Sequence, residues 1–179
     1  RLLGWNDWAL VLPTFVFSLA GIAIVYLVGA RGGDRLVGLA AAALVATVPL
    51  DLVQATTMTN DIVVAAWIAA GMAAVFSTPE RWSRGARVAL TGAAFLAAFL
   101  TKANALILPA VLGASLVILP EYRRRALDGL LGCLLAFALW SLATFVATGD
   151  AFYNFSLERA FYERNDPRHL GGGLPLGET

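Results

Sequence analysis

Three residue types that commonly build functional sites are nearly absent from this chain. It holds one cysteine, Cys133, one histidine, His169, and one lysine, Lys102. A disulfide framework needs a second cysteine and a cysteine zinc site needs several, so both are excluded. Charged residues make up only 14% of the chain, and the net charge is +1. This near-neutrality does not predict a nucleic acid partner.

Apolar residues, in contrast, are abundant. They make up 59% of the 179 residues, against about 45–50% in average soluble domains. A soluble domain of this size lacks the interior to bury so many apolar side chains, and a lipid bilayer is the simpler solvent. We therefore expect an all-α, polytopic membrane protein. Because the chain starts at Arg1 and ends on a glycine-rich stretch, we interpret it as an internal piece of a longer polypeptide.

Polar interruptions divide residues 1–147 into about six apolar segments. We expect a transmembrane helical domain there, with spans at about 8–30, 36–50, 61–76, 88–100, 105–119 and 127–147. Residues 148–179 are polar and aromatic, and we expect an outer-side loop that begins a truncated region. Several spans are shorter than the about 20 residues that cross a bilayer. The short spans predict either that the bilayer thins around them or that their outer loops are recessed in a water-filled or protein-lined cavity.

The arginines distinguish the two sides of the predicted membrane domain. Eight arginines lie in three loops, at 31–35, 77–87 and 120–126, against one lysine in the two short loops between them, at 51–60 and 101–104. The positive-inside rule assigns the arginine loops to the cytoplasm, and Lys102 and the tail to the outer side. We expect a multi-pass protein of a plasma membrane, specifically a bacterial inner membrane, whose site faces outward.

The loop before the third span holds the first candidate site residues. Asp61 is the catalytic candidate: it either caps a helix start or stands at a cavity edge, where it accepts a proton or orders a metal. Asn60 precedes it. Asp51 follows the second span, where an acid opposes the helix dipole, which favours a binding partner and a solvated loop equally. These acids are compatible with a divalent metal, but the sequence defines no ligand set.

Lys102 lies on the side with few cations. It either extends to lipid headgroups or binds a phosphate as a point charge, with Asn104 adding hydrogen bonds. Asp150 and Tyr153 in the tail complete the substrate-binding candidates, although aromatic residues at a span end also form interfacial belts. The remaining acids are interpreted as ordinary charges at span ends: Asp7, Asp34, Glu80, Glu121 and Asp128.

Four short motifs follow one another along the chain. They are Arg35-Leu-Val-Gly-Leu-Ala-Ala-Ala through Pro49, Thr59-Asn60-Asp61, Leu100-Thr101-Lys102 and Thr148-Gly-Asp150-Ala-Phe-Tyr-Asn154. In their order and spacing the chain resembles, over residues 1–165, the membrane glycosyltransferases of the C-type fold. The resemblance is strongest to bacterial relatives of the protein O-mannosyltransferases and of the lipid A aminoarabinose transferase.

The resemblance implies a reaction. Such enzymes pass a sugar from a polyprenyl-phosphate donor to a lipid, glycan or protein acceptor at the outer side of the membrane. Lys102 matches a lysine suited to stabilising the leaving phosphate, and Asp61 matches the family's second outer-loop acid. The first outer-loop acid, the expected principal base, would lie upstream, so we expect the chain alone to be inactive.

Two other functions remain open at this point. A membrane transporter would need polar residues at mid-depth and usually an internal repeat, neither of which the sequence shows. A non-catalytic membrane subunit fits the composition as well. Polar residues gathered at one side of the membrane favour the transferase.

Overall fold

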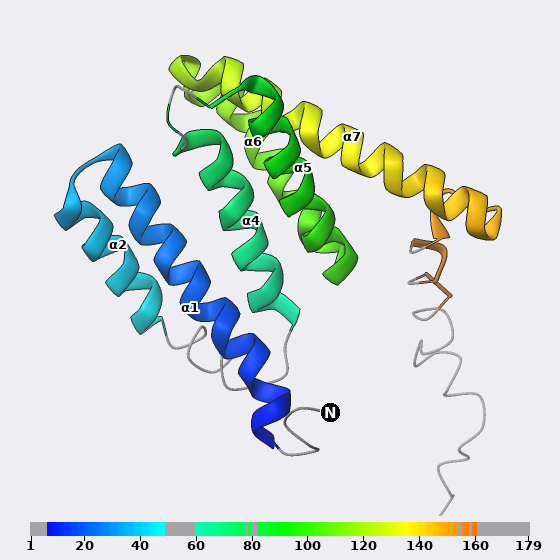
Figure 1. The fold of residues 1–179 in the computed structure, drawn as a ribbon, viewed down its shortest axis with the longest axis horizontal. Coiled ribbons are helices and arrows are strands. Elements are labelled where there is room, and N and C mark those ends of the chain that lie inside the picture. Colours follow the sequence, from blue (N-terminus) through cyan, green and yellow to red (C-terminus); the bar gives the residue numbers. More distant parts are fainter. Residues whose placement is uncertain are drawn as a thin grey trace, which may run out of the picture. The chain divides into compact units, whose positions relative to one another are not determined.

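The described part of the chain is entirely helical. The structure is a computed structural model that describes residues 7–48, 60–77, 79, 82–153, 155–157, 159 and 160. Within these ranges there is no β-strand, and the elements in chain order are α1 (Asp7–Gly32), α2 (Arg35–Thr47), α4 (Asn60–Phe76), α5 (Arg84–Thr101), η1 (Ala103–Leu106), α6 (Ile107–Ile118), η2 (Pro120–Tyr122) and α7 (Arg123–Thr148) (Figure 1). The chain divides into two compact units, Arg1–Phe137 and Ala138–Thr179, and each unit is described by itself.

Polar residues between the apolar segments set the helix starts. The Asp34 carboxylate accepts hydrogen bonds from the backbone N–H groups of Leu36 and Val37, at 2.7 and 2.9 Å, and so caps α2. The Ser83 hydroxyl accepts from the Ala86 N–H at 3.1 Å and caps α5. These bonds satisfy N–H groups that a helix start otherwise leaves without a partner. Asp34, interpreted from sequence as an ordinary charge, therefore has a defined structural role.

Consecutive helices of the first unit run in opposite directions. Side chains of α1 and α4 meet at two levels, in the same order along both helices. Phe17 contacts Trp67 near the middle of each helix, with ring centroids 5.7 Å apart, and Arg31 bonds the Ser77 carbonyl at the end, so these two helices are parallel. In α5 and α7, Phe99 contacts Phe137 near one end and Arg84 contacts Asp128 near the other. The first half of α7 therefore runs in the same general direction as α5, although the two helices cross at an angle (Figure 1).

The chain reverses direction between α5 and α6. The α5 helix ends at Thr101, the short η1 turn follows, and α6 starts at Ile107. Two antiparallel helices are thus present where a continuous helix would have carried the arginine loops to opposite ends. This is the arrangement that the arginine distribution requires.

The core of the first unit lies between α4, α5, α6 and the start of α7. Its largest fully buried side chains are Phe95, Leu108, Leu112, Val75 and Thr91. Glycines let these helices approach closely: a Cβ at Gly92 of α5 would lie 2.8 Å from the carbonyl oxygen of Gly132 in α7. A real Cβ does not tolerate that distance, so this contact requires glycine.

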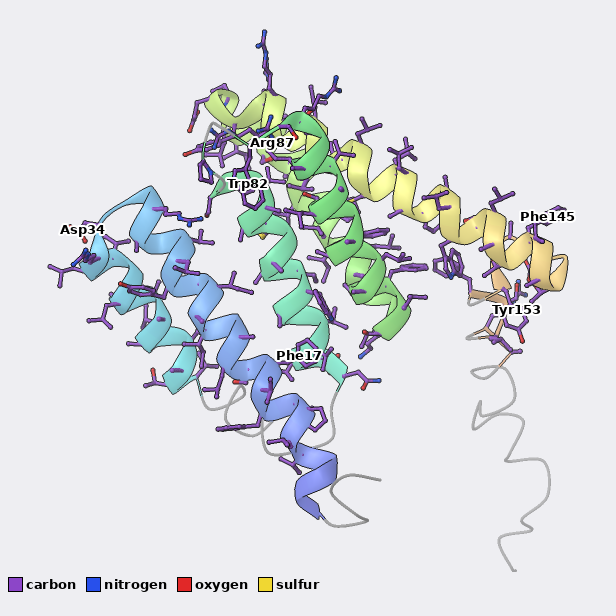
Figure 2. All side chains as sticks on the ribbon, in the orientation of Figure 1. Phe17, Asp34, Trp82, Arg87, Phe145 and Tyr153 are labelled. Carbon is purple, nitrogen blue, oxygen red and sulfur yellow. The ribbon has the colours of Figure 1, made fainter. Side chains whose placement is uncertain are left out.

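The outer helix surfaces are apolar, as the membrane interpretation expects. Leu36, Val117 and Val146 are each exposed by 74% or more, and many other large apolar side chains stand off the helices (Figure 2). Exposed apolar surface on this scale points to a lipid or protein environment. Two helical stretches are long and apolar enough to cross a membrane, Val11–Gly32 and Pro120–Thr148. The assignment of the other helices as spans stays a prediction.

Candidate active site

An ion pair joins the two residues that the sequence singled out most strongly. The Lys102 ammonium donates to Oδ1 of Asp61 at 2.7 Å. The residues are 41 positions apart in sequence and meet because α4 starts where the antiparallel α5 ends. Both side chains are partly exposed, 46% for Asp61 and 43% for Lys102. The pair is thus accessible to a ligand approaching this end of the helices.

Helix dipoles favour both charges of this pair. Asp61 lies in the first turn of α4, where the helix end carries partial positive charge. Lys102 is the residue that ends α5, and its own N–H bonds the Ala98 carbonyl at 2.9 Å. A cation at a helix C-terminus is stabilised by the partial negative charge there. The two helix ends therefore stabilise a carboxylate and an ammonium group side by side at one end of the bundle.

The other candidates near the pair are placed less completely. Asn60 is the first residue of α4 and is exposed next to Asp61. Asn104 lies in η1, two residues after Lys102, and its backbone alone is described. Asp51 lies outside the described residues. The structure thus brings Asp61, Lys102 and the backbone that carries both asparagines to one end.

Asp150 and Tyr153 belong to the second unit and are described within it. The Asp150 carboxylate accepts from the Ser156 hydroxyl at 2.7 Å and from the Phe152 N–H at 2.8 Å. These two hydrogen bonds, that of Ser156 first, lower the pKa of Asp150 from its ordinary value. Tyr153 is 38% exposed. Asp150 therefore lies in a local turn just after α7, at which Gly149 has a positive φ of 77°, and Tyr153 is helical.

An apolar groove lies beside the ion pair. Its volume is about 380 Å³, and it runs between α5, α6 and the first half of α7 with Phe95, Leu106, Pro109, Leu130, Cys133, Leu134 and Phe137 as its lining. Leu106 closes η1, the turn whose Ala105 N–H bonds the Lys102 carbonyl at 3.1 Å. One end of the groove therefore lies at the turn that follows Lys102 in the chain, although Lys102 is not among the lining residues.

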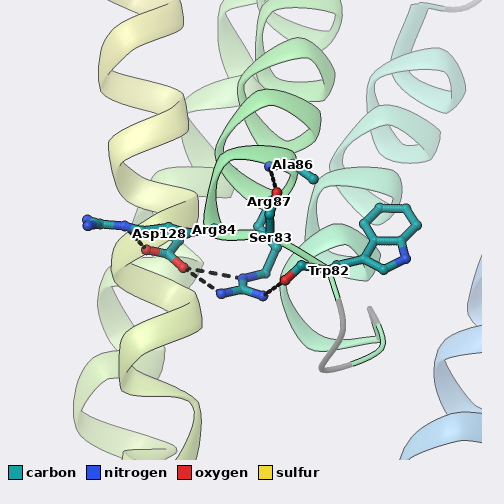
Figure 3. Close-up of polar contacts among 6 residues, drawn as sticks. All are labelled: Trp82, Ser83, Arg84, Ala86, Arg87 and Asp128. Carbon is teal, nitrogen blue, oxygen red and sulfur yellow. Dashed lines mark hydrogen bonds and ion pairs between the residues drawn. The ribbon is translucent and has the colours of Figure 1, made fainter.

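Sequence reasoning missed one charged cluster, and its interpretation of Asp128 was wrong. Asp128 is buried, with 8% of its side chain exposed. Its carboxylate accepts from Arg84 Nε at 2.7 Å and from Nε and Nη2 of Arg87 at 3.2 and 3.0 Å (Figure 3). Arg87 also donates from Nη1 to the Trp82 carbonyl at 2.8 Å. Asp128 is thus the buried centre of an arginine cluster at the opposite end of α5.

A pattern in the sequence does point to this cluster. Arg84 and Arg87 are three residues apart and so share one face of a helix start, where the dipole disfavours cations. Such a pair needs an acid from another element. Asp128 is the acid that follows Leu127 one turn into an apolar helix, which is an unusual place for an unpaired charge.

No group of three or more metal-ligating side chains is found among the residues that the structure describes. The acids of the described part lie singly. A hydrogen-bond donor lies beside each of four of them, namely Asp34, Asp61, Asp128 and Asp150. His169 lies outside that part. The arrangement therefore gives no ligand set to which a metal could be assigned.

Fold and site together define a class before any comparison. The described residues are helical, with exposed apolar faces, two stretches long enough to cross a membrane and a charged pair at one end, and these are features of helical membrane proteins. The family model described as dolichyl-phosphate-mannose-protein mannosyltransferase matches residues 1–148, and the chain belongs to this family. No significant match was found among curated proteins or among solved structures.

Family membership confirms the resemblance stated from the sequence motifs. It assigns the chain to a family of membrane-integral glycosyltransferases of the mannosyltransferase-like kind. The matched stretch, residues 1–148, includes Asp61, Lys102 and the arginine cluster, and it ends where α7 ends.

Proposed function

We propose that this chain is part of a glycosyltransferase that moves a sugar from a polyprenyl-phosphate donor to a lipid, glycan or protein acceptor. The observation that carries the proposal is the Asp61–Lys102 pair, which lies within the part of the chain that the mannosyltransferase family matches. The reaction develops negative charge on a lipid phosphate as the sugar leaves, and it needs a proton removed from the acceptor. The pair supplies one group for each need.

In this mechanism Lys102 exchanges partners. Without donor, its ammonium neutralises Asp61. A bound phosphate carries more negative charge than a carboxylate and draws the ammonium toward itself, which releases Asp61. The released carboxylate then orients or deprotonates the acceptor hydroxyl, or supports a stronger base elsewhere in the full protein. An exposed pair suits this exchange because little free energy is lost when it opens.

The groove beside Lys102 supports a lipid-linked donor. A polyprenyl tail is apolar throughout, as is the groove lining, and Leu106 lies at the Lys102 end. Burying each methylene-sized group of such a tail contributes about 0.8 kcal/mol. We therefore place the phosphate at Lys102 and the first isoprene units along α5, α6 and α7.

The arginine distribution supports an outward-facing site. Arg31, Arg84 and Arg87 lie at one end of the first unit, and Asp61 and Lys102 lie at the other. By the positive-inside rule the arginine end is cytoplasmic. We propose that the remaining apolar helices cross the membrane with α1 and α7, in a bacterial inner membrane.

The arginine cluster does not support the transporter alternative. Asp128 is the buried acid of the described residues, and two arginines bond it at an end of α7. A proton or ion path needs an acid that changes its state at mid-depth.

The test uses the full-length protein with a polyprenyl-phosphate sugar and an acceptor. Asp61→Asn and Lys102→Ala should each lower kcat/KM by about 10²–10³-fold, as removal of a charge-stabilising group does elsewhere. Lys102→Arg should recover part of the loss. Glu121→Gln and Arg124→Gln make the same charge changes at exposed positions near η2 and should leave turnover unchanged. Unchanged turnover in both Asp61→Asn and Lys102→Ala would refute the site assignment.

The groove has its own test. Leu134→Trp narrows the groove, and Leu135→Trp adds the same ring at a neighbouring exposed position outside its lining. The first variant should raise KM for a long-chain donor and leave KM for a short-chain donor unchanged. Equal effects of the two variants would remove the groove from the proposal and leave the ion pair untouched.

A further inference from the structure

A second groove lies at the arginine end of the first unit, between α1, α4 and α5. Its volume is about 330 Å³. Small residues of α4 form its floor, namely Ala70, Ala73 and Ala74, and two tryptophans and one arginine line its length: Trp67, Trp82 and Arg31. None of these residues takes part in the Asp61–Lys102 pair or in the first groove. This groove is therefore a separate surface feature, and a ligand bound in it would not contact the ion pair or the first groove.

The groove has the length of one membrane leaflet. Trp67 and Ser77 are ten residues apart on or just after α4, which corresponds to about 15 Å of helix. The hydrocarbon core of a bilayer is about 30 Å thick, so this length is about one leaflet. Arg31 bonds the Ser77 carbonyl and so marks the end of the groove that lies at the arginine end of the first unit. Trp67 marks the opposite part of the groove, nearer the middle of α4.

Arg31 is available to an anionic headgroup. Its Nη1 donates to the Ser77 carbonyl at 2.7 Å, and no acid of the described residues forms an ion pair with it. A guanidinium presents five N–H groups in a planar fork that matches phosphate oxygens. Trp82 lies beside it in the groove lining, and its ring is directed away from the Arg87–Asp128 contacts (Figure 3). An arginine and a tryptophan at this depth are the residues that hold lipid headgroups at an interface.

We propose that this groove binds an anionic phospholipid. Its phosphodiester lies on Arg31, its glycerol region lies against Trp82, and one acyl chain runs along the alanine floor of α4 toward Trp67. The lining supports a phospholipid, because it combines the Arg31 guanidinium with an apolar floor of alanines. The charge supports an anionic lipid over a zwitterionic one, and the arginine end is where anionic lipids of the cytoplasmic leaflet meet basic residues.

Native mass spectrometry of the full-length protein, released from detergent with equal amounts of phosphatidylglycerol and phosphatidylcholine, measures this selectivity. Wild type should retain phosphatidylglycerol about 10-fold over phosphatidylcholine, a difference of about 1.4 kcal/mol. Arg31→Gln should abolish the preference. Arg35→Gln is the matched control, since it removes a nearby exposed arginine outside the groove, and it should change nothing.

A second variant tests the apolar part of the groove. Ala73→Phe fills the floor while Arg31 stays in place, and it should reduce retention of both lipids. Quenching of tryptophan fluorescence by phosphatidylglycerol brominated on its acyl chain gives an independent readout, which Trp67→Phe should weaken because the chain runs toward Trp67. Excess sn-glycerol 3-phosphate, the free headgroup, should not displace the lipid.

Four results would overturn the proposal. They are equal retention of the two lipids by wild type, unchanged selectivity in Arg31→Gln, displacement by the free headgroup, and a protein segment or second copy of the chain cross-linked into the groove in place of lipid. Sugar transfer is not measured in this experiment, so its outcome is independent of the proposed function.

Discussion

The two ends of α5 each carry an ion pair, and the pairs differ in every respect that decides their role. At the start of the helix Asp128 is buried and accepts three hydrogen bonds from Arg84 and Arg87. At its end Asp61 is 46% exposed and accepts one, from Lys102. The first pair opposes the helix dipole and the second agrees with it.

The difference separates a structural pair from a reactive one. A buried carboxylate held by two guanidinium groups cannot be released without leaving buried charge, so it fixes α5 against α7. An exposed pair that the dipoles already favour opens at little cost and can take a new ligand. The same residue types therefore stabilise the fold at one end and, in the function we propose, act on a substrate at the other.

Removal of the buried acid should have the largest effect. Asp128→Ala leaves Arg87, whose side chain is 14% exposed, without its carboxylate. We expect a loss of about 3–5 kcal/mol in the free energy of unfolding, because an uncompensated charge stays buried. Thermal unfolding in detergent measures it, with Glu121→Gln, an exposed acid, as the control. A loss below about 1 kcal/mol, the range of surface ion pairs, would remove the distinction between the two ends.

The close contact of α5 with α7 should be the next most sensitive feature. Gly132→Ala places a Cβ against the Val88 carbonyl oxygen and the Gly92 nitrogen, both of them backbone atoms that cannot move aside alone. Overpacking of this kind costs about 1–3 kcal/mol. Gly113→Ala in α6 is the control: it meets nothing within 4 Å, and it should stabilise the protein by about 0.5–1 kcal/mol. If both substitutions change stability in the same direction, the rigid contact is not there.

The exposed pair should matter little for stability. Asp61→Asn, Lys102→Met and the double variant should each change the free energy of unfolding by no more than about 1 kcal/mol. The double-mutant cycle gives their coupling energy, which we expect within the same limit. A coupling above about 3 kcal/mol would mean that this pair is structural like the other one, and that the exchange of Lys102 to a phosphate is too costly to propose.

The contrast between the ends also explains what sequence could predict. Asp61 and Lys102 were identifiable because each is a charge in a short loop between apolar segments, where local pattern is enough. Helix locations followed from the same pattern. The spacing of Arg84 and Arg87 indicates that they need an acid, but the pairing of Asp128 with partners 41 and 44 positions away and its burial depend on how the helices pack. The second groove was equally hidden, since its alanines, tryptophans and Arg31 come together only when α1, α4 and α5 pack.

Asp150 is a third acid with hydrogen bonds of its own, and the loss of one of these bonds should have the smallest effect of the changes considered. Its bonds from Ser156 and Phe152 are local, and they lower the pKa of the carboxyl group. A lowered pKa means that the folded turn favours the ionised form. The stabilisation is therefore complete above the ordinary aspartate pKa, about 3.9, and disappears as the pH falls through the lowered value.

An NMR titration of the Asp150 carboxyl group, with hydrogen exchange at the Phe152 amide, tests this. Ser156→Ala should move the pKa of Asp150 back toward its ordinary value, because the hydrogen bond from the Ser156 hydroxyl lowers that pKa the most. Ser156→Thr keeps the hydroxyl and should not change the pKa. Sugar transfer near neutral pH should be the same in both variants if Asp150 only shapes the turn after α7. A loss of transfer in Ser156→Ala alone would instead show that the ionised, oriented carboxylate acts on substrate. Asp150 would then belong with the reactive acid Asp61 rather than with Asp128.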